Sequence, residues 1–117
     1  MNDDLATDAV FAALAHPARR RILDLLVASP GSSVKAIAGH FDFSRIATMK
    51  HLATLESAEL IISEKSGRVR KHYFNAIPIQ RIYDRWTTSY GSFWAGRLAD
   101  IQTRVEARES KGTKKHA

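Results

Sequence analysis

The segment Val34–Leu60, with the sequence VKAIAGHFDFSRIATMKHLATLESAEL, decides the fold that the rest of the chain must accommodate. Apolar residues recur at helical spacing in its first part and again in its second part, which predicts two short helices with one buried face each. Between them Asp42 marks a tight turn, because Asp tolerates positive φ better than most residues. Ser44 has the side chain of an N-cap for the second helix. The segment therefore predicts a helix-turn-helix.

The second predicted helix has an outer face unlike that of an ordinary surface helix. Thr48, Leu52 and Leu55 form its buried stripe, and the opposite face is apolar and basic where a surface helix usually has glutamates. Methyl groups beside a lysine suit the major groove of DNA, where they meet thymine methyls while the ammonium meets phosphate. We expect the DNA contacts of this helix to come from Arg45, Ile46, Ala47, Met49, Lys50 and Thr54.

The next segment, Leu60–Ala76 (LIISEKSGRVRKHYFNA), has the pattern of a β-hairpin with Ser66-Gly67 at its tip. Residues 65–71 contain cations and no acid. A solvated hairpin needs some charge, but a cluster of one sign beside a glycine turn is better explained as a set of phosphate contacts. We expect these contacts from Lys65, Arg68, Arg70 and Lys71. A helix-turn-helix followed by a basic hairpin is the winged-helix arrangement.

Composition agrees with a small nucleic-acid-binding protein. The chain has 117 residues, enough for one domain, and 18 Lys and Arg against 12 Asp and Glu give a net charge of +6. The sequence pI near 10.0 favours polyanionic partners. With no cysteine, the chain has no disulfide, thiolate metal site or cysteine nucleophile. No apolar run approaches ~18 residues and there is no secretion leader, so we expect a cytoplasmic protein without a membrane partner.

Two helices are predicted before the helix-turn-helix, over residues 3–14 and from Pro17 to the helix-ending run Ser29-Pro30-Gly31. The second contains three consecutive arginines, residues 19–21, which must point in different directions around the helix. We expect at least one of them to pair with an acid or reach phosphate, and the others to be solvated.

A long helix is predicted from Pro78 to about Glu109, with apolar residues three or four positions apart and with Gly91 and Gly96 as interruptions. About thirty residues span ~45 Å, longer than so small a domain, so part of this stripe stays wet unless another chain covers it. Dense aromatic residues are typical of interface centres, and two-fold proteins read two-fold DNA sites. We therefore expect a homodimer with contacts from Leu5, Phe11, Trp86, Tyr90, Phe93, Trp94, Leu98 and Ile101.

The predicted architecture is mainly α with a small β-hairpin, a winged helix-turn-helix that dimerises through its long C-terminal helix. Residues 1–109 form the single domain, and residues 110–117 form a basic, flexible tail.

These elements resemble the arsenic-repressor-like (ArsR/SmtB) family of bacterial transcriptional repressors. The resemblance covers roughly residues 8–100 and lies in FAALAHPARRRILDLL, IAGHFDFSRIATMKHLATLESAELI and GRVRKHYFNA. It implies a dimeric winged helix that blocks transcription by occupying an operator, and it adds Ser44 and His51 to the expected DNA contacts. The family commonly has Gly at the position of Asp42 and Pro at that of Ile46. Its metal-sensing thiolate pairs, and the paired His and acid ligands of its C-terminal helix, are missing, so the resemblance gives no support to metal sensing.

Other chemistry has little support in the sequence. The five histidines (His16, His40, His51, His72 and His116) never recur at the close spacing of a zinc site. Helix capping, packing or phosphate contact is the better interpretation of each. No nucleophile elbow, glycine-rich phosphate loop or paired carboxylates are present, so we expect no enzyme activity and no cofactor.

Two alternatives to DNA-binding regulation remain open at this level. In the first, the winged helix is a scaffold whose aromatic helix binds another protein. In the second, the aromatic stripe is a pocket for an unidentified small-molecule effector, lined by Tyr83, Trp86, Tyr90 and Trp94.

Overall fold

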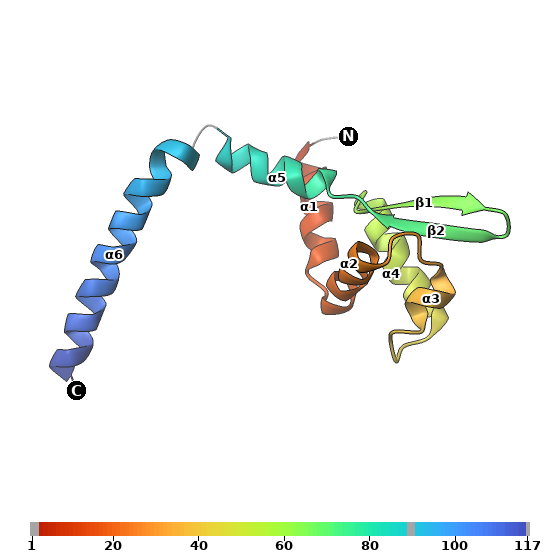
Figure 1. The fold of residues 1–117 in the computed structure, drawn as a ribbon, viewed down its shortest axis with the longest axis horizontal. Coiled ribbons are helices and arrows are strands. Elements are labelled where there is room, and N and C mark those ends of the chain that lie inside the picture. Colours follow the sequence, from red (N-terminus) through yellow and green to blue (C-terminus); the bar gives the residue numbers. More distant parts are fainter. Residues whose placement is uncertain (1–2, 89–90, 117) are drawn as a thin grey trace. The chain divides into compact units, whose positions relative to one another are not determined.

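Helices and one β-hairpin follow one another along the part of the chain that the structure, a computed structural model, describes: residues 3–88 and 91–116. The chain divides into two compact units, residues 1–82 and 83–117. The first unit contains four helices, the antiparallel hairpin and the first part of a fifth helix, in the order of a winged helix (Figure 1). The elements are α1 (Asp3–Leu14), α2 (Pro17–Ala28), α3 (Val34–Ala38), α4 (Arg45–Ser57), β1 (Ile61–Ser66), β2 (Val69–Phe74), α5 (Ile77–Thr87) and α6 (Gly91–His116).

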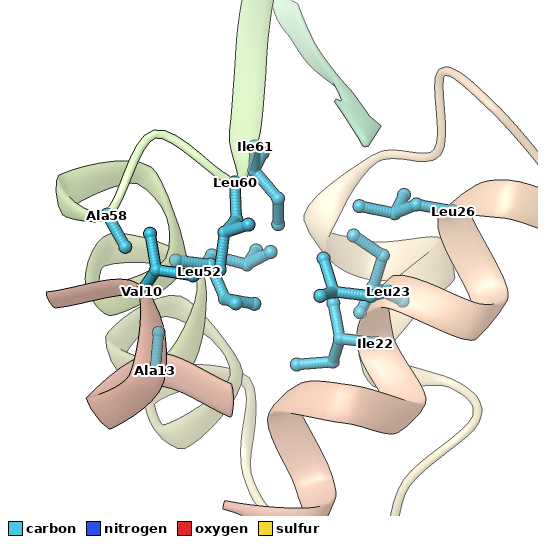
Figure 2. Close-up of a cluster of buried hydrophobic side chains, with 11 residues drawn as sticks. Val10, Ala13, Ile22, Leu23, Leu26, Leu52, Ala58, Leu60 and Ile61 are labelled. Atoms are coloured by element: carbon cyan, nitrogen blue, oxygen red, sulfur yellow. The ribbon is translucent and has the colours of Figure 1, made fainter. Parts of the chain in front are cut away.

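The core of the first unit lies between the first four helices and the base of the hairpin. Figure 2 shows side chains of α1 and α4 pointing toward those of α2, with Leu60 and Ile61 entering from the start of the hairpin. Thr48, Leu52 and Leu55 are buried on one face of α4, as the sequence predicts. Burial of this apolar stripe fixes the rotation of α4 about its axis, and therefore which of its residues face solvent.

The starts of α2, α3 and α4 agree with the sequence prediction, and each of these three helices has a capping side chain. His16 caps α2 by accepting from the amide of Ala18 at Nδ1, and Ser33 caps α3 by accepting from the amide of Ala36. Ser44 caps α4 by accepting from the amide of Ala47 at 3.1 Å. An N-cap satisfies one of the amides that the first turn of a helix leaves without a partner.

The arginines 19–21 have partners inside the protein that sequence reasoning missed. We expected an acid or a phosphate as the partner of at least one. Instead, Arg19 and Arg20 donate to carbonyl oxygens at the end of α1, and the Arg21 guanidinium lies 5.2 Å from the centroid of the Phe41 ring. Cations at the carboxyl end of a helix satisfy its last carbonyls and interact favourably with its dipole.

The hairpin pairs Ile61 with Phe74 at its base and Ser66 with Val69 at its tip. The two-residue loop is therefore Gly67-Arg68, one residue further along the chain than the predicted Ser66-Gly67. Gly67 has φ +64, which fits a turn with glycine at its first central position. Near the base of the hairpin, Ser32 forms an isolated antiparallel bridge with His72. The segment before α3 therefore pairs with β2 at this one position.

Positive φ occurs at Glu59, which follows α4, and not at Asp42, where we predicted it. The amide of Leu60 donates to the carbonyl of Leu55, and that of Glu59 donates to the carbonyl of Glu56, both at 2.9 Å. This pair of bonds ends the helix with a left-handed residue. The turn before α4 spans several residues, Gly39 to Phe43, and needs no left-handed residue at Asp42.

Replacing Glu59 with Gly should stabilise the protein. A left-handed residue with a Cβ costs about 1–2 kcal/mol, and glycine gives back about 0.5–1 kcal/mol through the entropy of the unfolded chain. We therefore expect a gain of about 0.5–1 kcal/mol in the free energy of unfolding, measured by urea denaturation. Glu59→Ala, which keeps the Cβ, is the matched control and should change little. A Glu59→Gly variant less stable than the alanine variant would contradict the assignment of strain.

The prediction of a single long helix after the hairpin is wrong, because the structure has two helices in this part of the chain. α5 ends at Thr87, Thr88 is in a turn, and α6 begins at Gly91. Threonine and glycine are poor helix formers, and the Thr87 hydroxyl donates to the carbonyl of Tyr83 at 2.6 Å. α6 runs to His116, beyond the predicted end at Glu109, so most of the predicted tail is helical.

Candidate nucleic-acid interface

The outward face of α4 consists of the apolar and basic residues that the sequence predicted to be exposed. Ile46 and Met49 are 67% and 53% exposed, and Ser44, Arg45, Lys50 and Thr54 are also exposed. Ala47 and His51 are half-buried on one flank of the helix. Large apolar side chains on a free surface mark a binding site, and cations among them favour an anionic partner.

An aromatic stack holds the turn that leads into α4. The Phe41 and Phe43 rings are stacked with centroids 4.7 Å apart, and Phe43 meets the His51 ring edge-on at 5.3 Å. Arg21 of α2 lies over the other end of the stack, on Phe41. The stack joins α2, the turn and α4, so the start of α4 is held by side chains as well as by its N-cap.

His51 faces the start of α2. Its Nδ1 lies 3.5 Å from an Arg19 guanidinium nitrogen, and its ring centroid is 4.7 Å from that of His16. Partial burial, followed by the neighbouring His16 and Arg19, holds the pKa of His51 below its usual value. His51 is therefore neutral at physiological pH, and any DNA contact it makes is a hydrogen bond.

The hairpin separates the four predicted cations by face. Lys65 and Arg70 are directly opposite each other and share a face, and Arg70 donates to the Ser63 hydroxyl at 3.1 Å. Arg68 lies in the loop, whereas Lys71 lies on the other face, opposite Glu64. All four side chains are exposed. Like charges directly opposite each other destabilise a hairpin, so the Lys65–Arg70 pair favours an anionic partner on that face.

The hairpin projects beyond the helices in Figure 1, and its base continues from the end of α4. The first unit thus carries two cationic elements, a helix with apolar residues between its cations and a hairpin with cations around its tip. A duplex can meet both, because a helix fits the major groove and a basic hairpin can follow the phosphate backbone.

Most of the predicted dimer residues are exposed in the described part of the chain. Leu5 and Phe11 are exposed on α1, Trp86 on α5, and Phe93, Leu98 and Ile101 on α6. Trp94 is half-buried, with the Arg97 guanidinium 5.6 Å from its ring centroid. Tyr90 lies outside the described residues.

The described residues contain no cluster of three or more His, Asp or Glu side chains that could hold a metal ion. Two of the histidines have the packing or capping roles expected for them. His16 caps α2, and the buried His72 lies with Nδ1 3.0 Å from the Ser32 carbonyl oxygen and Nε2 3.9 Å from Glu56. Within residues 3–88 and 91–116, no helix combines the length and hydropathy needed to cross a membrane.

Sequence reasoning missed Arg19 as part of this site. A signal was available, because a cation in the first turn of a helix is unfavourable for that helix and must be stabilised by a partner elsewhere. The Phe41–Phe43 stack gave no comparable signal, since aromatic residues two positions apart do not share a helix face.

Residues 14–64 match the family model of a helix-turn-helix domain. The chain is 37% identical over 73 residues to the transcriptional repressor SdpR of Bacillus subtilis (strain 168), covering 61% of this chain and 78% of SdpR. It is 33% identical over 85 residues to the HTH-type transcriptional regulator YuzN of the same organism, covering 68% and 92%.

Solved structures show the same relationship. An ArsR-like transcriptional regulator from Rhodococcus sp. RHA1 superposes with a TM-score of 0.66 at 30% identity, covering 88% of this chain and 93% of that one. This family consists of transcriptional regulators and not of enzymes. Taken with the exposed face of α4 and the basic hairpin, these matches show that the chain belongs to the ArsR family of winged-helix, DNA-binding transcriptional regulators.

Proposed function

We propose that the protein is a homodimeric repressor that occupies a pseudo-palindromic operator in double-stranded DNA. The observation that carries the proposal is the outward face of α4, where exposed Ile46 and Met49 lie among the cations Arg45 and Lys50. The name of the relative SdpR, a transcriptional repressor, supports the sign of regulation.

In this proposal α4 reads the base sequence, and the hairpin contacts phosphates. Arg45, at the first position of α4, reads a base edge, while Ile46, Ala47 and Met49 offer apolar contact to thymine methyls. Lys50 and the cations of the hairpin neutralise phosphates, which supplies affinity with little sequence preference. Arg68 and the Lys65–Arg70 pair are the best-placed hairpin contacts, because Glu64 lies opposite Lys71.

The proposal of a dimer rests on an apolar stripe along α5 and α6, most of which the same chain leaves exposed. On α5, Ile79 and Ile82 pack against the core, but Tyr83 and Trp86, further along the same face, are exposed. On α6, Trp94, Leu98, Ile101 and Val105 follow one another at spacings of four, three and four residues. Such spacing makes one continuous seam along a helix, which a second copy can cover.

Replacing Arg68 or Arg70 with Ala should weaken binding to all duplexes alike. If both subunits contact phosphate, each change should lower the salt dependence of binding by about two counterions per dimer. The measurement is the slope of log K against log salt concentration, on a preferred duplex and a random one. Arg104→Ala, which removes an equal charge from α6, is the control and should leave the slope unchanged. Altered sequence preference with an unchanged slope would contradict a phosphate role for the hairpin.

The proposed function as a whole is tested by selecting duplexes from a random-sequence pool with the wild-type protein. We expect enrichment of a two-fold-symmetric sequence that is bound more tightly than random DNA at physiological salt. Failure to bind duplex DNA at that salt would favour the alternative in which the winged helix is a protein-binding scaffold.

A further inference from the structure

One guanidinium contacts three residues on two helices other than its own. Arg19, in the first turn of α2, donates from Nε to the Ala13 carbonyl at 2.7 Å and from one terminal nitrogen to the Ala12 carbonyl at 3.0 Å. Its other terminal nitrogen lies 3.5 Å from Nδ1 of His51 in the middle of α4. All three nitrogens of the side chain are thus used, two on α1 and one on α4.

The chemistry of the two groups fixes the direction of the Arg19–His51 bond. Arginine has no acceptor atom, so Nδ1 of His51 must be the unprotonated nitrogen that accepts. The neutral ring then carries its proton on Nε2. Burial, His16 and Arg19 together lower the pKa of His51 and favour this neutral form. A protonated His51 would place an N–H donor against Arg19 and would break the bond.

We propose that Arg19 is a positioning residue for DNA recognition, because its guanidinium ties the recognition helix α4 to the end of α1 through His51. The proposal rests on the proposed function, since it concerns how α4 is presented to DNA. α1 also carries Leu5 and Phe11, which we expect to contact the second copy in the dimer. The Arg19 side chain therefore links a helix of the proposed dimer interface, α1, to the recognition helix α4. Arg19 acts through His51 and needs no contact with DNA itself.

The neighbouring Arg20 provides a matched control. Its guanidinium donates to the carbonyl of Leu14 at 2.6 Å, so it also caps the end of α1. It has the same charge and lies on the same turn of α2, but its hydrogen bond goes to α1 alone. A comparison of the two arginines therefore separates the link to α4 from the loss of charge. Because Arg19 makes two bonds to the end of α1 and Arg20 makes one, substitution of His51 separates the link from the loss of the cap.

The experiment uses the duplex that the wild-type protein selects from a random-sequence pool, with random DNA as the reference. Arg19→Met should weaken binding to the selected duplex about tenfold relative to Arg20→Met, the loss expected for one charge-assisted hydrogen bond. Binding to random DNA should fall equally in the two variants, because each loses one positive charge. Equal losses on the selected duplex would overturn the proposal.

The state of the His51 ring gives a readout that a purely structural role of Arg19 would not move. Nitrogen NMR of the full-length protein should show a single tautomer with the proton on Nε2, in the wild type and in Arg20→Met. In Arg19→Met both tautomers should appear, and the pKa of His51 should rise toward its usual value because a neighbouring cation is lost. Unchanged His51 signals in Arg19→Met would contradict the link.

Substitution of His51 tests the same link without touching the cap of α1, should Arg19→Met fail to fold. Asn has a carbonyl oxygen at the δ position and can accept from Arg19, whereas Leu cannot. His51→Asn should bind the selected duplex more tightly than His51→Leu does. With a folded Arg19→Met variant, that difference should vanish in the Arg19→Met background. Equal binding by the two variants would overturn the proposal. Failure of the wild type to distinguish selected from random DNA would instead count against the proposed function.

Discussion

A Trp94→Asp variant should remain folded but become monomeric, and should lose most of its affinity for a two-fold operator. Trp94 begins the seam on α6 that continues through Leu98, Ile101 and Val105. A carboxylate placed in a desolvated contact costs several kcal/mol of association. Each monomer keeps its α4 and hairpin but loses the second half-site. Affinity for the whole operator should therefore fall far more than affinity for a single half-site.

The measurement pairs light scattering at micromolar concentration with duplex binding. Phe93→Asp, which changes an exposed neighbour on α6, should have the same effect. Thr103→Asp is the matched control, because Thr103 is exposed on the face of α6 opposite the seam and the substitution introduces the same charge. We expect the control to stay dimeric. A folded Trp94→Asp dimer, or a monomeric wild type, would contradict the dimer seam and would assign the aromatic residues to the domain core or to an effector pocket. Titration of tryptophan fluorescence with candidate effectors would then test the pocket.

An Arg45→Ala variant should lose about 1–3 kcal/mol of binding at each half-site of the preferred operator, if the guanidinium forks onto a guanine. Half-sites one helical turn apart are well separated, so the loss should approximately double for the dimer. Binding to random DNA should fall much less. Arg45 is exposed at the start of α4, just after the Ser44 cap, where the recognition helix of this class of motif contacts base edges.

Lys50→Ala is the control for Arg45→Ala, because it also removes a cation from the exposed face of α4. A comparison of the two variants separates base contact from loss of charge. We expect Lys50→Ala to weaken selected and random duplexes by similar factors, as the loss of a phosphate contact does. Substituting each base pair of the operator in turn should show that Arg45→Ala is indifferent to one position. Equal losses on the two kinds of duplex for Arg45→Ala would place its guanidinium on the backbone.

Local chemistry made most of the winged helix predictable. The start of α2 follows from Pro17, the cap of α4 from Ser44, and the buried face of α4 from the spacing of Thr48, Leu52 and Leu55. These features depend on residues within a turn or two of one another, so periodicity and capping rules suffice. The exposed set on α4 followed as the complement of its buried stripe.

The predictions that failed concern positions where local preferences alone do not decide the backbone conformation. Asp42 lies in the turn between α3 and α4, and Glu59 follows the end of α4. The left-handed conformation occurs at Glu59, because Leu60 must turn into the core there. Likewise, the apolar spacing continues from Ile79 to Val105 across Gly91 and Gly96, so spacing alone does not mark a helix end between them. The weak helix formers Thr87, Thr88 and Gly91 nevertheless divide that stretch into α5 and α6.

The sequence by itself determined the helix-turn-helix and the basic hairpin, because those patterns are local and repeat with the period of the element. It also carried the resemblance to the family, through the three segments that match it. Only the tertiary structure decided the partners of Arg19 and the surroundings of His51. These two residues are 32 positions apart, and no periodicity relates them. They meet because burial of one face of α2 and one face of α4 in the same core turns the flanks of the two helices toward each other. Side-chain contacts of this kind depend on packing geometry, which composition and spacing do not encode.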